Sequence, residues 1–283
     1  MKYQSLIFLV LIGSNLLTWN SVIFNGPKSD LNIYFLDVGQ GDGSFVRLPG
    51  GVDILIDGGP GRATLDSLSR VLPDADRYID LAVVTHPQLD HFGGFIDIFK
   101  KYEIGAVIWN GREGTAAAWP ELVKLIEEKN IRTIKLKEGD KITYADNVFD
   151  VLSPNNTFLK SKELNDTGLV MRLESEGIKA LFTADIGQNI EDYLIAKYDM
   201  DIDILKVGHH GSRFSSSTEF LGETTPVVSS VSVGAKNRYG HPTKQALASI
   251  ASADSSIYRT DEDGTVHVEA NNGKINIYQS SGD

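Results

Sequence analysis

The strongest chemical signal in the sequence is the segment THPQLDH, which is followed by the glycine pair 93–94. Its ligand-type side chains are His86, Asp90 and His91, and they follow the apolar run 81–84, where we expect a strand to end. Imidazole nitrogens and carboxylate oxygens are ordinary ligands of zinc and other divalent ions. Two of the six histidines of the chain lie in this short window, which favours a metal site over incidental surface histidines.

A second pair of histidines occurs in the segment DILKVGHHGSRFSSS. His209 and His210 follow an apolar run, and adjacent residues of an extended chain cannot both face the same way. We therefore expect one of them to bind metal and the other to contact substrate or a neighbouring ligand. The serines that follow, Ser212 among them, either donate hydrogen bonds to an anionic oxygen of the substrate or cap a helix that begins near Thr218.

A third histidine-containing motif, NRYGHP, places His241 directly before Pro242, a residue that favours the first position of a helix. Lys236, Asn237 and Arg238 are close by in the sequence. A histidine beside a helix N-terminus and near cations suits phosphate contact or proton donation. We expect these residues to bind substrate, with His241 in a catalytic role.

Several aspartates follow apolar runs or glycine-rich turns. Asp185 could bridge two metal ions because its two oxygens accept independently, although a lone aspartate after a strand is more often a turn residue. Asp37 and Asp42 in LDVGQGD and Asp57 in LIDGG are weak signals one by one. Because they occur together with the histidine motifs, we predict that they orient the ligands.

The pattern of apolar runs indicates the elements that must position these side chains. Short runs rich in β-branched residues predict strands at 32–36, 44–48, 53–56, 81–85, 106–109, 148–152, 169–173, 179–183, 204–207, 227–233, 257–260, 265–269 and 274–278. Amphipathic patterning predicts helices at 63–72, 92–102, 119–129, 188–198 and 243–253. Paired strands at each end with helices between them predict an α/β fold of two sheets packed face to face, with helices outside.

Composition narrows the classes of function. The chain has 283 residues, of which 41% are hydrophobic and 23% charged, and this excludes a disordered or many-pass membrane protein. The absence of cysteine excludes disulfides, a thiolate nucleophile and a Cys-ligated metal site. The formal net charge of −11 disfavours broad duplex binding, which requires a basic face, but leaves room for a local cationic pocket.

The N-terminal segment 1–28 is expected to lie outside the folded domain. Residues 3–27 carry no charge, and the 19 residues 6–24 are about as long as a helix that crosses a bilayer. Without an Ala-x-Ala-like site we favour an uncleaved membrane anchor over a cleaved secretory signal. Lys2 favours a cytoplasmic N-terminus, so the domain 29–283 is predicted to work outside the cytoplasm.

In their order along the chain, LDVGQGD, LIDGG, THPQLDHFGG, FTADIG, LKVGHHGS and NRYGHP resemble the motifs of metallo-β-lactamase-fold hydrolases. More narrowly, they resemble the C-terminal domain of ComEC-type DNA-uptake proteins and its stand-alone relatives. The resemblance extends over about residues 31–278. It implies a four-layer αββα sandwich with the metal site at one edge, between the two sheets.

The resemblance also implies the ligands. Asp90 and His91 would bind one metal ion together with either His209 or His210, and Asp185 would bridge to a neighbouring ion. The cofactor is then a divalent metal, Zn²⁺ or Mn²⁺, with one or two ions per chain.

The neighbouring site departs from the family pattern. It would contain His86, but Gln88 stands where the superfamily has a histidine, and its neutral amide oxygen is a weaker ligand than imidazole or carboxylate. The third histidine that the family has before the bridging aspartate is also missing. Asn165, by contrast, matches the ComEC-like members, which usually have Asn at this place. This site is therefore expected to have few strong ligands. Its members would be His86, Gln88, Asn165 and the shared Asp185.

These features favour metal-assisted hydrolysis, with Asp90 as a ligand that orients the attacking water and a phosphodiester as the substrate. A phosphate ester, a nucleotide or the end of a single-stranded DNA fits the resemblance, and no protein partner is evident. Hydrolysis of a carbon ester or lactone is the alternative on the same scaffold. A degenerate metal-binding module with little catalysis is a further alternative, which Gln88 favours.

Overall fold

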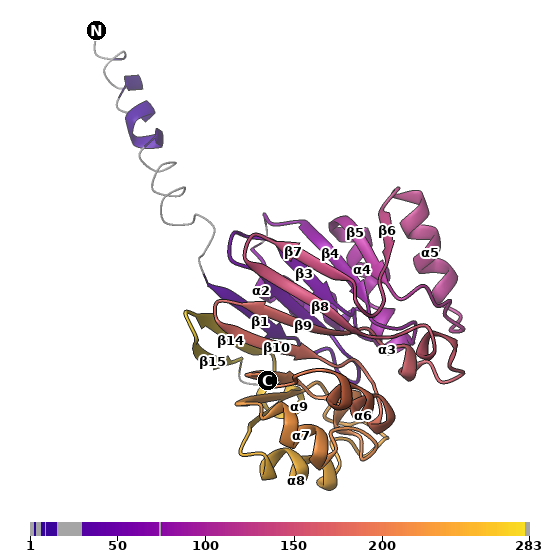
Figure 1. Ribbon diagram of the computed structural model, residues 1–283. Helices are drawn as coiled ribbons and strands as arrows, with labels where there is room; N and C mark the ends of the chain where they lie inside the picture. Colours follow the sequence, from indigo (N-terminus) through magenta and orange to yellow (C-terminus); the bar gives the residue numbers. More distant parts are fainter. Residues whose placement is uncertain (1–2, 4–6, 9, 16–29, 74, 281–283) are drawn as a thin grey trace.

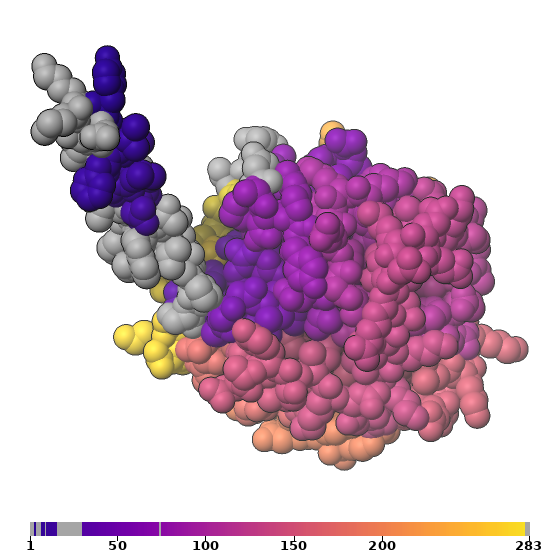
Figure 2. Space-filling view, turned by 90° about the horizontal axis from the view of Figure 1, so that it is seen from above, coloured from indigo at the N-terminus to yellow at the C-terminus, as the bar shows by residue number. Residues whose placement is uncertain are grey.

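The computed structural model describes residues 3, 7–8, 10–15, 30–73 and 75–280. The predicted segment 1–28 lies mostly outside these residues. Its described members, among them Tyr3, Ile7 and Phe8, have exposed side chains and stand apart from the rest of the chain (Figure 2). In the described part of the chain, no helix has both the length and the apolarity needed to cross a bilayer. Membrane attachment and an extracytoplasmic location stay predictions.

From residue 30 onward the chain forms two sheets that pack face to face (Figure 1). Among the described residues the first sheet comprises, in spatial order, β15 (Lys274–Gln279), β14 (Val266–Asn271), β1 (Leu31–Phe35), β2 (Ser44–Arg47), β3 (Asp53–Ile56), β4 (Tyr78–Val84), β5 (Glu103–Trp109) and β6 (Arg132–Lys135). The second comprises β13 (Ser256–Arg259), β12 (Val228–Val231), β11 (Ile204–Lys206), β10 (Ile178–Phe182), β9 (Val170–Ser175), β8 (Asn147–Ser153) and β7 (Lys141–Tyr144).

Helices cover the outer face of each sheet. The first sheet carries α2 (Ala63–Val71), α4 (Phe95–Lys101) and α5 (Trp119–Glu128), and the second carries α6 (Gln188–Lys197), α7 (Thr218–Thr224) and α8 (Lys244–Ser252). Shorter helical turns lie in the connections, namely α3 (Leu89–Phe92), α9 (Thr260–Asp263), η1 (Phe158–Lys160), η2 (Asn165–Thr167) and η3 (Gly208–Gly211).

Successive side chains of a strand point to opposite faces of the sheet, so the strands of the first sheet contribute to two cores. Ile33 and Phe35 of β1 pack between the sheets against Phe149 and other residues of the second sheet. Phe45 and Leu55 point the other way, into a core shared with helices α2, α4 and α5. A third core lies between the second sheet and its own helices. The predicted four-layer αββα sandwich is confirmed.

The predicted helices agree with the structure to within a few residues, with one exception. The pattern over 92–102 predicts one helix, whereas the chain forms α3 and α4, with Gly93 and Gly94 between them. A Cβ at Gly94 would lie 1.9 Å from the Gly58 carbonyl oxygen, so this junction packs directly against the loop after β3. A side chain at this position would therefore clash with the backbone behind the ligands.

Sequence patterning did not predict strands β6 and β7 because both are edge strands with mostly exposed side chains. The strands that matter for the site were predicted. Strands β3 and β4 are parallel neighbours in the first sheet, and β10 and β11 are parallel neighbours in the second. The carboxyl ends of parallel neighbours meet at the same edge, and this edge is where the motif loops begin.

Candidate metal centre

Four predicted ligands meet at this edge. Asp90 and His91 lie in α3 after β4, Asp185 follows β10, and His210 lies in η3 after β11. One ligand atom from each lies within 4.8 Å of all the others. The Asp185 Oδ2 atom is 3.3 Å from His91 Nε2 and 3.4 Å from His210 Nε2, and Asp90 Oδ2 is 3.5 Å from His210 Nε2. We call these four residues the ligand cluster.

The imidazole of His91 is held by Asp57. Its Nδ1 lies 2.8 Å from Asp57 Oδ2. Asp57 also accepts from the Thr85 amide at 2.9 Å and from the Thr85 hydroxyl at 2.8 Å, so the carboxylate is fixed in place. Because Nδ1–H donates to Asp57, the neutral form of His91 has its lone pair on Nε2, which faces the cluster. Asp57 therefore orients a ligand, as the sequence predicts.

His210 is oriented in the same way from the second sheet. Its Nδ1 lies 2.9 Å from the Ser232 carbonyl oxygen, which can only accept, so the neutral form of this imidazole keeps its proton on Nδ1 and offers the lone pair of Nε2 to a metal ion. Asp42 Oδ1 is also 3.2 Å from this Nδ1. Asp42 thus contacts a ligand, as the sequence predicts.

The structure separates the roles of the two adjacent histidines. Both have left-handed backbone, with φ of 48° at His209 and 53° at His210, a strained conformation for residues with a Cβ. As a result the two rings diverge, with centroids 6.2 Å apart and planes at 73°. His210 is buried in the ligand cluster, whereas His209 lies beside His241 with ring centroids 5.7 Å apart.

The cluster leaves buried polar atoms without partners. Among the described residues, His91 Nε2, His210 Nε2 and Asp185 Oδ1 are buried and have no hydrogen-bond partner. Buried polar atoms are nearly always paired, so three such atoms at one point indicate a missing ligand. A mixed nitrogen and oxygen set of two imidazoles and two carboxylates fits a divalent ion such as Zn²⁺ or Mn²⁺.

Mutual charge sets the protonation of the cluster. Burial alone raises the pKa of Asp185, but the charges of His210 and His91 outweigh it and hold the pKa well below its ordinary value. Burial alone lowers the pKa of His210, but Asp185 and Asp42 outweigh it and raise the pKa to about 10. The pKa of His91 is raised well above its ordinary value, against burial, by Asp185 and Asp57. A metal ion would replace these protons.

A buried lysine supports the cluster, and the sequence motifs did not single it out. Lys206 is the last residue of β11 and is buried, and its ammonium donates to Asp42 Oδ2. Burial alone raises the pKa of Asp42, but Lys206 and His210 outweigh it and lower the pKa to about 2. The available signal was a single lysine inside the otherwise apolar run at the end of a predicted strand.

The neighbouring ligand set is arranged differently. His86 is buried, its Nε2 has no hydrogen-bond partner among the described residues, and its ring centroid is 4.1 Å from that of His91. Burial and the charge of His91 lower the pKa of His86 to about 3, so this imidazole is neutral. Gln88 and Asn165 do not point to an ion together, because the Gln88 amide donates to Asn165 Oδ1.

A cleft of about 560 Å³ opens over the ligand cluster. Lys236, Arg238 and His241 line it together with His209, and their predicted contact with substrate stays a prediction. Burial and the charge of His209 lower the pKa of His241, which keeps this imidazole neutral at pH 7. Asn237 also lines the cleft.

The side chain of Asn237 organises the loop around it. Its amide donates to the His241 carbonyl oxygen at 2.6 Å and to the Gly234 carbonyl oxygen at 2.9 Å. Its Oδ1 accepts from the His241 amide at 3.1 Å. Asn237 therefore fixes the position of His241 in the cleft.

Two predicted site residues, Ser212 and Asp37, lie away from the ligand cluster. Ser212 is buried, its Oγ accepts from the Phe214 amide at 3.3 Å, and it is not among the residues that line the cleft. Ser217 caps α7, with its Oγ 3.2 Å from the Phe220 amide. Asp37 is exposed and accepts from the Gly39 amide at 3.2 Å, so it orients none of the four ligands.

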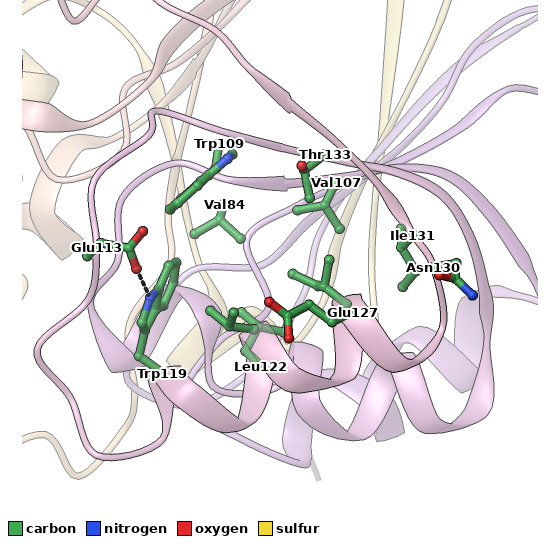
Figure 3. Close-up of a pocket in the computed structure, with 12 residues that line it drawn as sticks. Val84, Val107, Trp109, Glu113, Trp119, Leu122, Glu127, Asn130, Ile131 and Thr133 are labelled. Atoms are coloured by element: carbon green, nitrogen blue, oxygen red, sulfur yellow. Dashed lines mark hydrogen bonds between the residues drawn. The ribbon is translucent and has the colours of Figure 1, made fainter.

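A pocket of similar size, about 570 Å³, lies between α5 and strands β5 and β6 (Figure 3). Trp109 and Trp119 stand at one end of it, and Trp119 donates to Glu113 at 2.9 Å. Its floor includes Val84 and Val107. This pocket contains none of the predicted site residues, so the cleft over the ligand cluster is the candidate site.

Comparison with known proteins agrees with this geometry. Residues 53–225 match the family described as "Beta-lactamase superfamily domain". The chain is 27% identical over 297 residues to ComE operon protein 3 of Bacillus subtilis, covering 97% of this chain and 38% of that protein. It is 28% identical over 254 residues to competence protein ComA of Neisseria gonorrhoeae, covering 88% of this chain and 34% of that protein. The chain thus spans well under half the length of these relatives.

Solved structures share the fold at low sequence identity. The metallo-β-lactamase fold protein YhfI of Bacillus subtilis superposes with a TM-score of 0.55 at 12% identity, covering 88% of this chain and 100% of that one. CmlA, a diiron β-hydroxylase of Streptomyces venezuelae, has a TM-score of 0.55 at 14% identity, covering 89% of this chain and 54% of that one. The predicted resemblance to ComEC-type proteins is confirmed, and the chain belongs to the β-lactamase superfamily, with the metallo-β-lactamase fold.

Proposed function

We propose that this protein is a metal-dependent hydrolase that cleaves phosphodiesters. The observation that carries the proposal is the convergence of unpaired Nε2 atoms of His91 and His210 on two carboxylates, at the base of an open cleft. Family membership supports the reaction class.

The residues of the site fall into two groups, those that would bind the metal ion and those that would contact the substrate. A divalent ion in the ligand cluster lowers the pKa of a bound water and stabilises negative charge that develops during hydrolysis. Asp90, whose side chain is 32% exposed, is the most exposed of the ligands that line the cleft, so we assign to it the orientation of the attacking water. His241 offers a neutral imidazole at the same cleft, which suits it to move a proton.

The charges of the cleft favour an anionic substrate. The chain carries a net charge of −11, yet Lys236 and Arg238 lie together on the wall of the cleft. In the described part of the chain neither of them forms a salt bridge, so both remain able to pair with phosphate oxygens. The similarity to a competence protein favours a nucleotide or the end of a DNA strand as the substrate.

A panel of substrates tests the proposal. The 283-residue chain, stripped of metal and reloaded with Mn²⁺ or Zn²⁺, is expected to hydrolyse bis(p-nitrophenyl) phosphate, and Asp185→Asn is expected to lower the rate at least 100-fold. Lys236→Met combined with Arg238→Met is expected to raise KM for the phosphodiester more than it lowers kcat, because the two cations contact substrate rather than the metal.

The same panel separates the alternatives. Faster hydrolysis of a lactone or carbon ester than of any phosphodiester would assign the site to the alternative hydrolase. Metal binding without hydrolysis of any class of substrate would identify a degenerate binding module.

A further inference from the structure

We propose that this centre holds one divalent ion per chain, not the pair that the fold can hold in relatives such as the diiron CmlA. This inference rests on the proposed function, because it concerns the same site. It assigns the neighbouring residues Gln88 and Asn165 to a hydrogen bond with each other instead of to a second ion, which leaves His86 as the one imidazole of that set.

The neighbouring set cannot supply three ligands as it stands. Gln88 donates its amide hydrogen to Asn165 Oδ1, so the oxygen that Asn165 would offer to an ion is already accepting. Both side chains are neutral, and amide oxygens bind divalent ions weakly compared with imidazole or carboxylate. Among the buried side-chain atoms of this set, only the Nε2 of His86 has no partner, and one imidazole with a neutral amide oxygen of Gln88 is a weak set of ligands.

A second group of possible metal ligands is engaged with other groups of the protein. Asp42, Asp57 and His91 bring one ligand atom each within 4.8 Å of one another. Asp42 accepts from the ammonium of Lys206. Asp57 accepts from the Thr85 amide and hydroxyl and from His91 Nδ1. Asp42 Oδ1 accepts no hydrogen bond and lies 3.2 Å from His210 Nδ1, whereas the other three carboxylate oxygens accept from protein donors, so we assign this group to holding the ligands in place.

Charge balance points the same way. The two carboxylates of the ligand cluster, Asp90 and Asp185, carry −2 together, which one divalent ion neutralises. A second ion next to His86 would meet no further anionic side chain from Gln88 or Asn165 and would share only Asp185. Its charge would stay uncompensated in a buried site, which is costly.

Metal stoichiometry tests this inference without an activity readout. The 283-residue chain is saturated with Zn²⁺ or Mn²⁺, desalted and analysed by elemental mass spectrometry and by titration calorimetry. The wild type is expected to bind one ion per chain. Gln88→Ala and Asn165→Ala are expected to keep one ion with a Kd within threefold of the wild type, whereas Asp185→Asn is expected to lose it.

The outcomes separate the two proposals. Two ions per chain in the wild type, or a lower ion count in Gln88→Ala or Asn165→Ala, would overturn the single-ion inference and leave the hydrolase proposal standing. A wild type that binds no divalent ion would overturn both.

Discussion

At the scale of single residues, the centre depends on hydrogen bonds that fix which imidazole nitrogen carries the lone pair. Asp57 is the clearest case because its acceptors are all used by Thr85 and His91. Asp57→Asn presents an amide donor to His91 Nδ1 and favours the tautomer whose proton is on Nε2, where the metal binds. We expect Zn²⁺ affinity to fall 10- to 100-fold in a competition assay. The exposed Asp66→Asn is the control, and an unchanged Kd in Asp57→Asn would count against the orientation argument.

Lys206 is expected to matter for stability as well as for the site. Lys206→Met removes the ammonium and leaves Asp42 buried without its main partner. Removing one member of a buried ion pair costs about 3–5 kcal/mol. Urea unfolding of the metal-free protein measures this loss, with the exposed Lys129→Met as the control. A loss below about 1 kcal/mol would show that the pair does not hold the two sheets together.

The protonation of the cluster predicts how metal affinity depends on pH. In the metal-free protein the pKa of His210 is raised to about 10, so its imidazole is protonated at pH 7, and the raised pKa of His91 favours its protonated form as well. Metal binding must release these protons, and affinity is expected to rise as pH increases from 6 to 8. Calorimetry in buffers of different ionisation enthalpy measures the release. Binding at pH 7 without net proton release contradicts the assigned protonation.

The raised pKa of His210 also affects the stability of the metal-free fold, which is expected to fall with rising pH while metal affinity increases. His210 is protonated more readily in the folded than in the unfolded chain, whose histidine pKa is about 6.5. The stability that it contributes is fully present below about pH 6.5 and is lost as pH rises toward 10. The free energy of unfolding of the metal-free protein is therefore expected to decrease between pH 7 and pH 10, and the metal-loaded protein is expected to show less of this decrease. Chemical denaturation at several pH values, with and without metal, measures both trends.

At the scale of elements, the site is built where parallel strands end and their loops meet. The loop after β3 packs against the junction of α3 and α4, and Gly94 is the point of closest approach. Gly94→Ala is expected to lower the free energy of unfolding by about 1–3 kcal/mol, because the added methyl meets the Gly58 carbonyl oxygen. Gly61→Ala, where a Cβ meets nothing within 4 Å, is the matched control. Equal stability of the two variants would contradict the packing argument.

The elements also show how far the sequence can predict the site. The strands that end at 84, 182 and 206 were predicted from apolar runs to within one residue at these ends, and the loops after them carry the ligands. The sequence could not choose between His209 and His210, because the choice depends on two consecutive left-handed residues that alternation does not reveal. It also missed the pairing of Lys206 with Asp42, two residues far apart in the chain.

At the scale of the whole molecule, the four-layer sandwich followed from the order of the motifs and from strands grouped around helices. What the sequence left open was the count of metal ions. Gln88 signalled a weak neighbouring site, but only the structure shows that its amide is bonded to Asn165, 77 residues away. Side-chain pairs between distant loops depend on the packing of both sheets, which a pattern along one chain does not encode.

The central claim is that the ligand cluster binds a divalent ion through His210 and not through its neighbour. Measuring the Zn²⁺ affinity of His210→Ala beside that of His209→Ala tests it most directly, since the two substitutions are adjacent and chemically identical. The account predicts that His210→Ala loses at least 100-fold in affinity and that His209→Ala stays within threefold of the wild type. Equal losses in the two variants, or a larger loss in His209→Ala, would contradict it.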